Sequence, residues 1–185
     1  MISGILKNNG NYVRLIQPTI EHETILKSYV DEMLKNNDSC HGCGSIEKYE
    51  RYEDWLKHIE SYAVKALIPK DSKYVEGSQY FLYDETNQNV VGMVNIRHEL
   101  NAYLMKFGGH IGYSIRPSYR QKGYAKLQLN LALDILRKKG VDKALITCNS
   151  DNIASMKTIL ACGGVEDTPS IEDDGTIIKR FWITL

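Results

Sequence analysis

Residues 109–140 read GHIGYSIRPSYRQKGYAKLQLNLALDILRKKG, and they indicate more about the fold than any other segment. Residues 109–116 have the period-two pattern of a β-strand, which Pro117 closes. One helix face then follows, formed by Ala125, Leu129, Ala132, Leu133 and Leu136. Three basic residues and Gly140 are typical of a helix C-terminus. The segment therefore predicts a strand, a loop and a long amphipathic helix.

The loop before this helix has the character of an anion site. It carries Arg120, Lys122 and Lys126, with no acidic residue between positions 116 and 132. The first turn of a helix leaves backbone N–H groups unpaired, and the helix dipole adds partial positive charge there. Gly123 and Ala125 are small enough to let a bulky anion approach the backbone. A phosphate or pyrophosphate site is one interpretation; a basic helix start on the surface is the other.

A second polar segment, NSDNIAS at residues 149–155, follows a short apolar strand at 144–148 and opens a helix at 152–161. Asn and Ser are favoured helix caps, so capping explains at least one of these residues. The alternative places amide and hydroxyl groups on a cleft wall, facing a polar, chain-like ligand.

The remaining elements come from periodicity and turn signals. We expect a strand at 13–16, helices from 18 to about 34 and from 50 to 67, and a polar loop at 39–47. Strands at 78–84 and 90–98, a connection at 101–106 with room for a helical turn, and a hairpin of 165–171 with 177–185 complete the order. This order predicts a mixed α+β fold in a single domain, 1–185. Within it, 1–77 supply a strand and two helices, and 78–185 the central sheet, ligand site and hairpin.

Composition narrows the function classes. Lys and Arg number 23, as do Asp and Glu, so the formal net charge is zero and we expect no nucleic-acid partner. No apolar run is long enough to span a bilayer, and the N-terminus has no signal-peptide core, so no membrane partner is expected. Four cysteines without such a signal indicate free thiols and a cytoplasmic protein. Neither a P-loop nor a dinucleotide-binding motif is present.

Cys40-His41-Gly42-Cys43 has three interpretations: half of a zinc site, a redox motif or an ordinary loop. A zinc site needs a second ligand pair, and Cys148 and Cys162 are not spaced as one. A redox C-x-x-C is typical of a helix start after a strand, whereas this one follows a helix. These two arguments favour an ordinary loop, and we expect no metal site.

Taken together, the order and motifs of the C-terminal half resemble the GNAT (GCN5-related N-acetyltransferase) family of acyl-CoA-dependent enzymes. The family signature is Gln/Arg-x-x-Gly-x-Gly/Ala at a helix start, followed later by an Asn, small residues and a Gly. The matching residues are Arg120, Gly123, Ala125, Asn152, Ser155 and Gly163. The resemblance covers Gly92 to Leu185 well and the first ninety residues only in outline. Residues 96–125 are further similar to a subgroup of bacterial predicted acetyltransferases with no assigned substrate.

The resemblance implies a central, mostly antiparallel, splayed sheet flanked by helices. It also implies transfer of an acetyl group from acetyl-CoA to a primary amine of a small molecule or peptide, directly in a ternary complex. Homodimers are common in the family. The residues implied to bind acetyl-CoA are Tyr113, Ser114 and Ile115 for the pantetheine arm, Arg120, Gln121, Lys122, Gly123, Tyr124 and Ala125 for the pyrophosphate, and Asn152 and Ser155 for the pantetheine or thioester end.

Two positions depart from the family pattern. The Tyr that often protonates the leaving thiolate is Ile159 here, and the frequent acidic residue is Thr147. His98, which titrates near neutral pH, and Glu99, acting through a water, are the remaining candidates for the catalytic base. His98 could equally be a polar residue at a strand end, and His110 is expected in the core or at its rim. The departures keep open an alternative function, a non-catalytic acyl-CoA-binding or regulatory module on the same fold.

Overall fold

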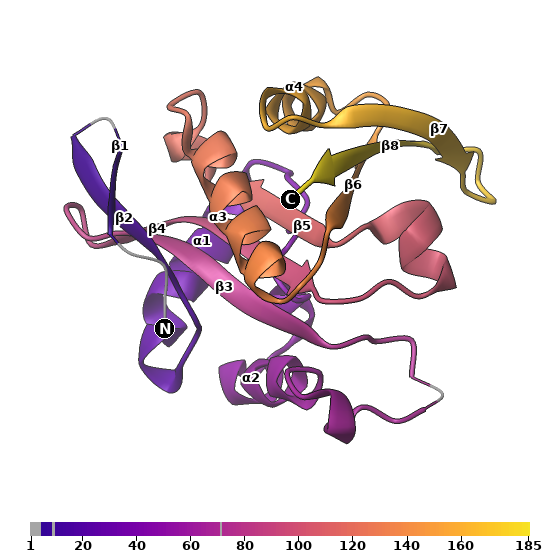
Figure 1. Cartoon of the computed structure of the whole chain (residues 1–185). Helices are drawn as coiled ribbons and strands as arrows, with labels where there is room; N and C mark the ends of the chain where they lie inside the picture. The colour runs from indigo at the N-terminus through magenta and orange to yellow at the C-terminus, as the bar shows by residue number, and fades with distance from the viewer. Residues whose placement is uncertain (1–4, 9, 71) are drawn as a thin grey trace.

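The computed structural model describes residues 5–8, 10–70 and 72–185, and within them the strands form two antiparallel sheets (Figure 1). The first sheet has the order β1 (Leu6–Asn8), β2 (Asn11–Ile16), β3 (Gly77–Asp84), β4 (Asn89–Arg97) and β5 (Ile111–Ile115). The second has the order β6 (Lys143–Asn149), β8 (Ile177–Thr184) and β7 (Val165–Ile171).

In the described residues the sheets are accompanied by the α-helices α1 (Glu23–Lys35), α2 (Tyr52–Ser61), α3 (Tyr124–Lys138) and α4 (Ile153–Ala161). Short 3₁₀ turns lie at Ile20–His22, Ile46–Lys48, Lys65–Leu67 and Pro117–Tyr119, and a π-helical turn at Leu104–Gly108. In Figure 1, α3 crosses the five-stranded sheet, and α4 lies beside β7 and β8. The predicted mixed α+β fold, with antiparallel sheets flanked by helices, is confirmed.

The first sheet separates two apolar clusters. Leu129 and Leu136 of α3 pack with Val94 on one face, in a cluster that extends to the second sheet. Leu26 of α1 and Trp55 of α2 belong to a cluster on the opposite face. A register shift between β3 and β4 reverses the alternation along β4, so that Val91 lies in the same cluster as Val94 and Val90 in the opposite one with Met93. Both faces of the sheet are thus covered.

The main differences from the predictions concern two helices and one strand. The second helix ends at Ser61 rather than 67, because the chain then turns and the Tyr62 carbonyl accepts from the Gly77 amide at the start of β3 (3.0 Å). The first α-helix begins at Glu23, after a 3₁₀ turn. The sequence did not predict β1, because three residues are too few to show a strand period.

The two sheets meet at a single point of hydrogen bonding between β5 and β6. The His110 amide donates to the Leu145 carbonyl (2.7 Å), and the Leu145 amide donates to His110 Nδ1 (2.9 Å). Gly109 makes this approach possible: its φ is +59°, and a Cβ there would lie 2.5 Å from the Leu145 oxygen. Beyond this junction β5 and β6 belong to different sheets, which is the splay that the sequence predicted.

Replacing Gly109 by Ala tests this junction. We expect the free energy of unfolding to fall by about 3 kcal/mol, because the new Cβ meets a backbone oxygen and the left-handed φ is strained. Gly140→Ala is the matched control: its φ is also positive (+82°), but nothing lies within 4 Å of a Cβ there. It should lose only about 1 kcal/mol. Equal losses in urea denaturation would contradict the packing argument.

Candidate functional site

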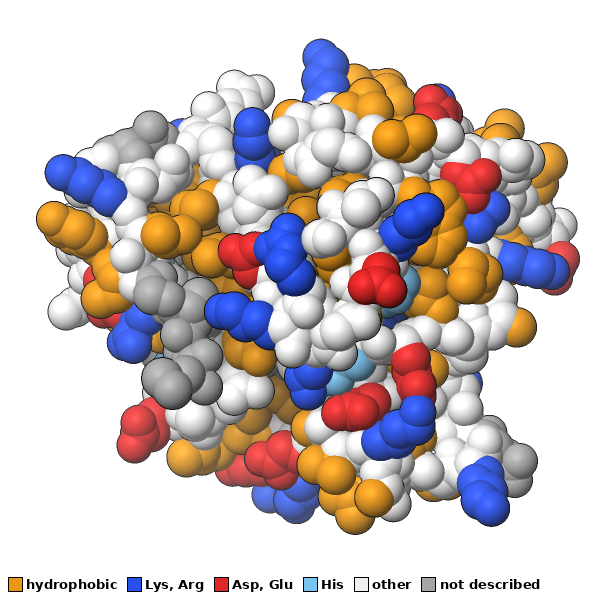
Figure 2. Space-filling model, in the orientation of Figure 1, with side chains coloured by type: hydrophobic (Ala, Val, Ile, Leu, Met, Phe, Trp, Pro, Cys, Tyr) orange, Lys and Arg blue, Asp and Glu red, His pale blue; other side chains and the backbone are white. Residues whose placement is uncertain are grey.

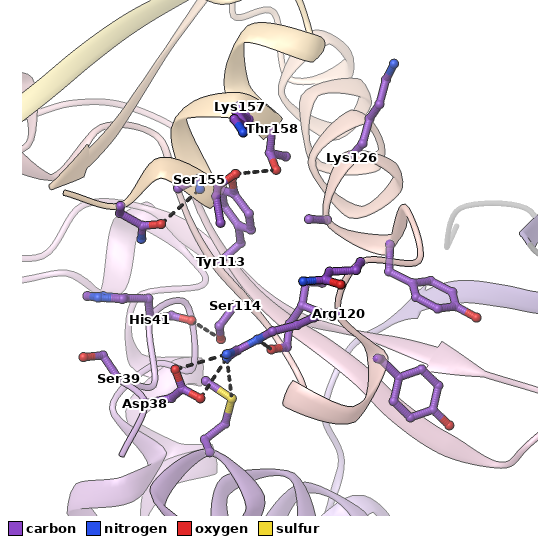
Figure 3. A pocket seen from close by; sticks show the side chains of 18 of the residues that line it. Asp38, Ser39, His41, Tyr113, Ser114, Arg120, Lys126, Ser155, Lys157 and Thr158 are labelled. Atoms are coloured by element: carbon purple, nitrogen blue, oxygen red, sulfur yellow. Dashed lines mark hydrogen bonds and ion pairs between the residues drawn. The ribbon is translucent and has the colours of Figure 1, made fainter. Parts of the chain in front are cut away.

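A pocket of about 830 Å³ opens where β5 and β6 diverge (Figure 3). Four parts of the chain line it: the segment after α1, the strand β5, the start of α3, and the end of β6 with the first turns of α4. Of the predicted ligand-binding residues, those that line it are Tyr113, Ser114, Ile115, Arg120, Gln121, Gly123, Tyr124, Ala125, Asn152 and Ser155. The tertiary structure therefore brings together two motifs that lie about thirty residues apart in the sequence.

The start of α3 faces this pocket with its backbone. Gly123 is the N-cap residue, has φ +79° and offers no side chain to cap the helix. The amides of Tyr124 and Ala125, in the first turn, have no acceptor within the helix. Gln121 also has a positive φ (+60°), so the chain makes a tight turn into the helix. This is the arrangement that suits a phosphate group at a helix N-terminus.

Arg120 is held by the protein itself. Its guanidinium forms an ion pair with Asp38 (3.0 Å) and donates from Nε to the Ile115 carbonyl (3.1 Å). Asp38 therefore offsets much of the positive charge of Arg120, which the sequence analysis expected to attract an anion. Lys126 and Lys157 also line the pocket and add positive charge to it. Arg120 therefore stabilises the loop between β5 and α3 and is not a free cation facing the pocket.

The side chains of Lys122 and Tyr124 are held by other parts of the protein. Lys122 does not line the pocket: its Nζ donates to the Ser118 carbonyl (2.9 Å) and lies 5.4 Å from the centre of the Tyr119 ring. The Tyr124 ring is buried, and its hydroxyl accepts a hydrogen bond from Asn11 (3.2 Å). The Tyr124 side chain therefore anchors the helix start to the first sheet, while its backbone faces the pocket.

Tyr113 of β5 crosses the gap between the sheets. Its hydroxyl shares a hydrogen bond with Ser155 Oγ of α4 (3.1 Å; Figure 3). Burial raises the pKa of this phenol to about 12, so it carries its proton at neutral pH. The next side chain, Ser114, points to the opposite face of the strand, where it donates to the His41 carbonyl (2.5 Å).

Asn152 caps α4, as the sequence allowed. Its Oδ1 accepts from the Ser155 amide (3.0 Å), and both residues also line the pocket. Capping and pocket lining are therefore compatible at this position. The cap fixes the first turn of α4 against the gap, so that the Ser155 hydroxyl reaches Tyr113.

His98 and Glu99, the predicted base candidates, lie elsewhere. They follow β4 near the closed end of the gap and do not line the pocket. The His98 side chain is 7% exposed, its Nε2 lies 2.7 Å from Ser78 Oγ, and Glu76 lies 3.4 Å from its Nδ1. Glu99 forms an exposed ion pair with Lys65. His98 thus lies at a strand end among polar partners, which was the alternative to a catalytic role. A catalytic role for either residue stays a prediction.

His110 is in the core, as expected. It is 6% exposed, and burial lowers its pKa to about 4, so the ring is neutral and Nδ1 can accept from Leu145. Nearby, Arg97 donates to the carbonyls of Gly108 (2.7 Å) and Gly109 (3.0 Å). Both residues therefore hold the junction of β5 and β6 together.

One wall of the pocket, formed by the loop after α1, was not predicted from the sequence. Asp38, Ser39 and His41 line it from the loop after α1, although this loop precedes β5 by about seventy residues. A weak signal existed in the glycines at 42 and 44, which permit close approach to another backbone. Gly42 does pack on β5: a Cβ there would lie 2.3 Å from the Gly112 carbonyl oxygen.

Among the described residues, no group of three or more His, Cys, Asp or Glu side chains is arranged to hold a metal ion. No helix in the same part of the chain has the length and apolarity to cross a membrane. On the face in Figure 2, Lys and Arg side chains are interspersed with Asp and Glu.

Comparison with known proteins gives a consistent picture. Residues 46–163 match the model of the acetyltransferase (GNAT) family. A putative ribosomal-protein-serine acetyltransferase from Vibrio cholerae is similar in structure (TM-score 0.66, 19% identity, 94% of each chain). So is RimL, a ribosomal α-N-protein acetyltransferase solved with coenzyme A (TM-score 0.71, 12% identity, 100% of this chain and 98% of that one). The V. cholerae spermidine/spermine N-acetyltransferase SpeG is a third (TM-score 0.62, 20% identity, 93% of each chain). No curated protein sequence matches significantly.

The buried His110 predicts a pH dependence of stability. Its pKa is about 4 in the folded chain against 6.5 for a free side chain, so the contribution is complete above pH 6.5. As the pH falls from 6.5 toward 4, the unfolded chain binds a proton that the folded chain rejects, and stability is lost. Between pH 7 and 5, His110→Gln should lose about 2 kcal/mol less than the wild type in urea denaturation. An NMR titration of the His110 ring with a midpoint near 6.5 would contradict this.

Proposed function

The chain belongs to the acetyltransferase (GNAT) family, and on that basis we propose that it transfers the acetyl group of acetyl-CoA to a primary amine, directly and in a ternary complex. One observation carries the proposal. The same pocket joins the uncapped backbone at the start of α3 to the strand β5, which is the last strand of its sheet in the described part of the chain. Such a pocket can hold a diphosphate and a chain of amides together.

The pocket residues fit the two polar parts of acetyl-CoA. The amides of residues 121–125 would bind the pyrophosphate, with Lys126 adding charge. The backbone of 113–115 would pair with the pantetheine amides as a further strand would, since among the described residues no strand pairs with β5 on the side toward β6. Asn152 and Ser155 would contact the pantetheine or thioester end from α4.

The reaction breaks the thioester C–S bond and forms a C–N bond. The amine loses a proton, and the departing thiolate gains one or leaves as the anion. A backbone N–H of β5 near Ile115 would polarise the thioester carbonyl. For the thiolate we assign Tyr113: its phenol is protonated at neutral pH, lies in the gap and is oriented by Ser155. It would supply from β5 the proton that many family members supply from the position of Ile159.

The group that accepts the proton of the amine is not identified by the pocket lining, because His98 and Glu99 lie outside the pocket. An α-amino group has a pKa of about 8, whereas that of a lysine side chain is about 10.4, so an α-amino acceptor needs less help to lose its proton. This favours a peptide or small molecule with an α-amino group. Two of the similar structures are described as ribosomal-protein acetyltransferases, and a third as a polyamine acetyltransferase.

The alternative, a non-catalytic acyl-CoA-binding or regulatory module, also has specific support. Thr147 and Ile159 stand where the family often has catalytic groups. Thr147 Oγ1 donates to the Phe107 carbonyl (2.7 Å), and Ile159 is fully buried. Release of free thiol from acetyl-CoA in the presence of amines separates the two functions. The possible homodimer stays a prediction.

Gly123→Trp tests the binding site. Isothermal titration should show that the wild type binds acetyl-CoA and that the variant binds at least about tenfold more weakly, a loss of ~1.4 kcal/mol. The indole would occupy the helix start, next to the amides proposed to bind the pyrophosphate. Gly140→Trp is the matched control, because this glycine has a similar φ (+82°) at the other end of α3 and open space around it. The absence of binding heat with the wild type would refute the proposal.

Tyr113→Phe tests the proton donor. We expect kcat to fall about tenfold to a hundredfold, with little change in acetyl-CoA affinity, because only the hydroxyl is removed. The assay is thiol release with a peptide bearing a free α-amino group and, separately, with a polyamine. Tyr103→Phe, which removes a hydroxyl from an exposed ring, should have no effect. An unchanged kcat in Tyr113→Phe, in an assay where the wild type turns over, would remove Tyr113 from the mechanism.

A further inference from the structure

The Cys40–Cys43 segment forms a hydrogen-bonded turn. The Cys43 amide donates to the Cys40 carbonyl (3.2 Å), and Gly42 between them has φ +76°. These are the features of a type II turn, in which the first and fourth Cα atoms lie within about 7 Å. Two cysteines at these positions are close enough to form a disulfide. Both are free thiols here.

Side chains from three other elements hold this turn through consecutive carbonyls. Ser114 of β5 donates to the carbonyl of residue 41 (2.5 Å), and Gln79 of β3 to that of residue 42 (2.8 Å). Trp55 of α2 donates to the carbonyls of residues 43 and 44 (3.2 and 3.0 Å). The relative positions of the two cysteines are therefore set by the fold and not by a freely moving loop.

The two thiols differ in environment and contact each other. Cys43 is fully buried, with Sγ 3.6 Å from Ser114 Oγ, and burial raises its pKa well above the ordinary value. Cys40 is half-buried, and the hydrogen bond from the Cys43 thiol lowers its pKa, despite its burial and the opposing charges of Asp38 and Glu47. Burial raises the pKa of both remaining thiols, Cys148 and Cys162. Cys40 is thus the thiol with the most thiolate character.

We propose that Cys40 and Cys43 are a redox-active dithiol in the turn that borders the pocket, oxidised to a disulfide by hydroperoxides. The Cys40 thiolate attacks the peroxide, the O–O bond breaks, and one oxygen leaves with a proton as water or an alcohol, which gives a Cys40 sulfenic acid. The Cys43 sulfur then attacks the Cys40 sulfur, the S–O bond breaks, and the hydroxyl leaves as water with the Cys43 proton. Two thiols supply the two electrons that reduce the peroxide.

The position of the pair connects it to the pocket. Ser39 and His41, on either side of Cys40, both line the pocket, and Asp38 pairs with Arg120 in the loop before α3. Ser114 contacts the turn from one face of β5, while Tyr113 faces the gap from the other. Acetyl-CoA in the pocket should therefore shield Cys40, an expectation that rests on the proposed function.

The test is mass spectrometry of the reduced protein after one equivalent of hydrogen peroxide. We expect the loss of about 2 Da, the two thiol hydrogens, with the bridge mapped to Cys40 and Cys43. The Cys148→Ser/Cys162→Ser double variant should show the same loss. Cys43→Ser should instead stop at a sulfenic acid that dimedone traps on Cys40. Since Cys43 is buried, Cys43→Ala and a thermal unfolding check show whether the fold survives the change.

Reaction with iodoacetamide at neutral pH gives a second measurement. Cys40 should react at least about tenfold faster than the other three cysteines, and acetyl-CoA should slow it at least about threefold. No mass loss in the wild type, or a loss that persists in Cys40→Ser, would overturn the proposal, as would equal labelling of all four thiols. Failure of acetyl-CoA binding in titration would count against the proposed function alone, because disulfide formation does not need that ligand.

Discussion

A single junction governs the shape of this molecule: in the described part of the chain, hydrogen bonds between His110 and Leu145 join the start of β5 to β6. Gly109 allows the two backbones to approach, and burial keeps the His110 ring neutral, so that it can accept the Leu145 amide. Because the strands are tied at one end and belong to different sheets, they must separate toward the other. The pocket is the space that this separation leaves, and α3 and α4 begin at its edges.

A partly buried ion pair fixes the other side of the pocket. Arg116, just after β5, is 7% exposed and pairs with Glu32 of α1 (2.5 Å). A second Glu32 oxygen accepts from the Ser118 amide (2.8 Å), and Asn89 accepts from the guanidinium (2.6 Å). Separating the pair would leave the buried Arg116 guanidinium without its counter-charge, which is costly, so α1 cannot easily shift from β5. The loop that follows α1 is consequently placed against the pocket.

The strand β5 links the two chemical features that we propose. Its alternation sends the Tyr113 hydroxyl into the gap, next to Ser155, and the Ser114 hydroxyl to the opposite face, onto the turn of Cys40 and Cys43. Its backbone remains available toward the gap beyond the junction. A change in the thiol pair and a ligand in the pocket therefore act on opposite faces of the same five residues. This arrangement gives a physical route by which the state of one could affect the other.

Much of the fold and part of the site could be predicted from the sequence, because they depend on local relations. Periods of two and 3.6 residues located most of the strands and helices, and a glycine before a basic amphipathic helix marked the proposed anion site. Capping was expected of at least one residue in 149–155, and Asn152 is that cap. What only the tertiary structure determined are relations between distant segments. Asp38 offsets the charge of Arg120, His98 and Glu99 lie away from the pocket, and two cysteines of a loop contact each other beside β5. The physical reason is that side-chain periodicity reports which face of an element is buried, whereas the packing of the whole chain determines what that face meets.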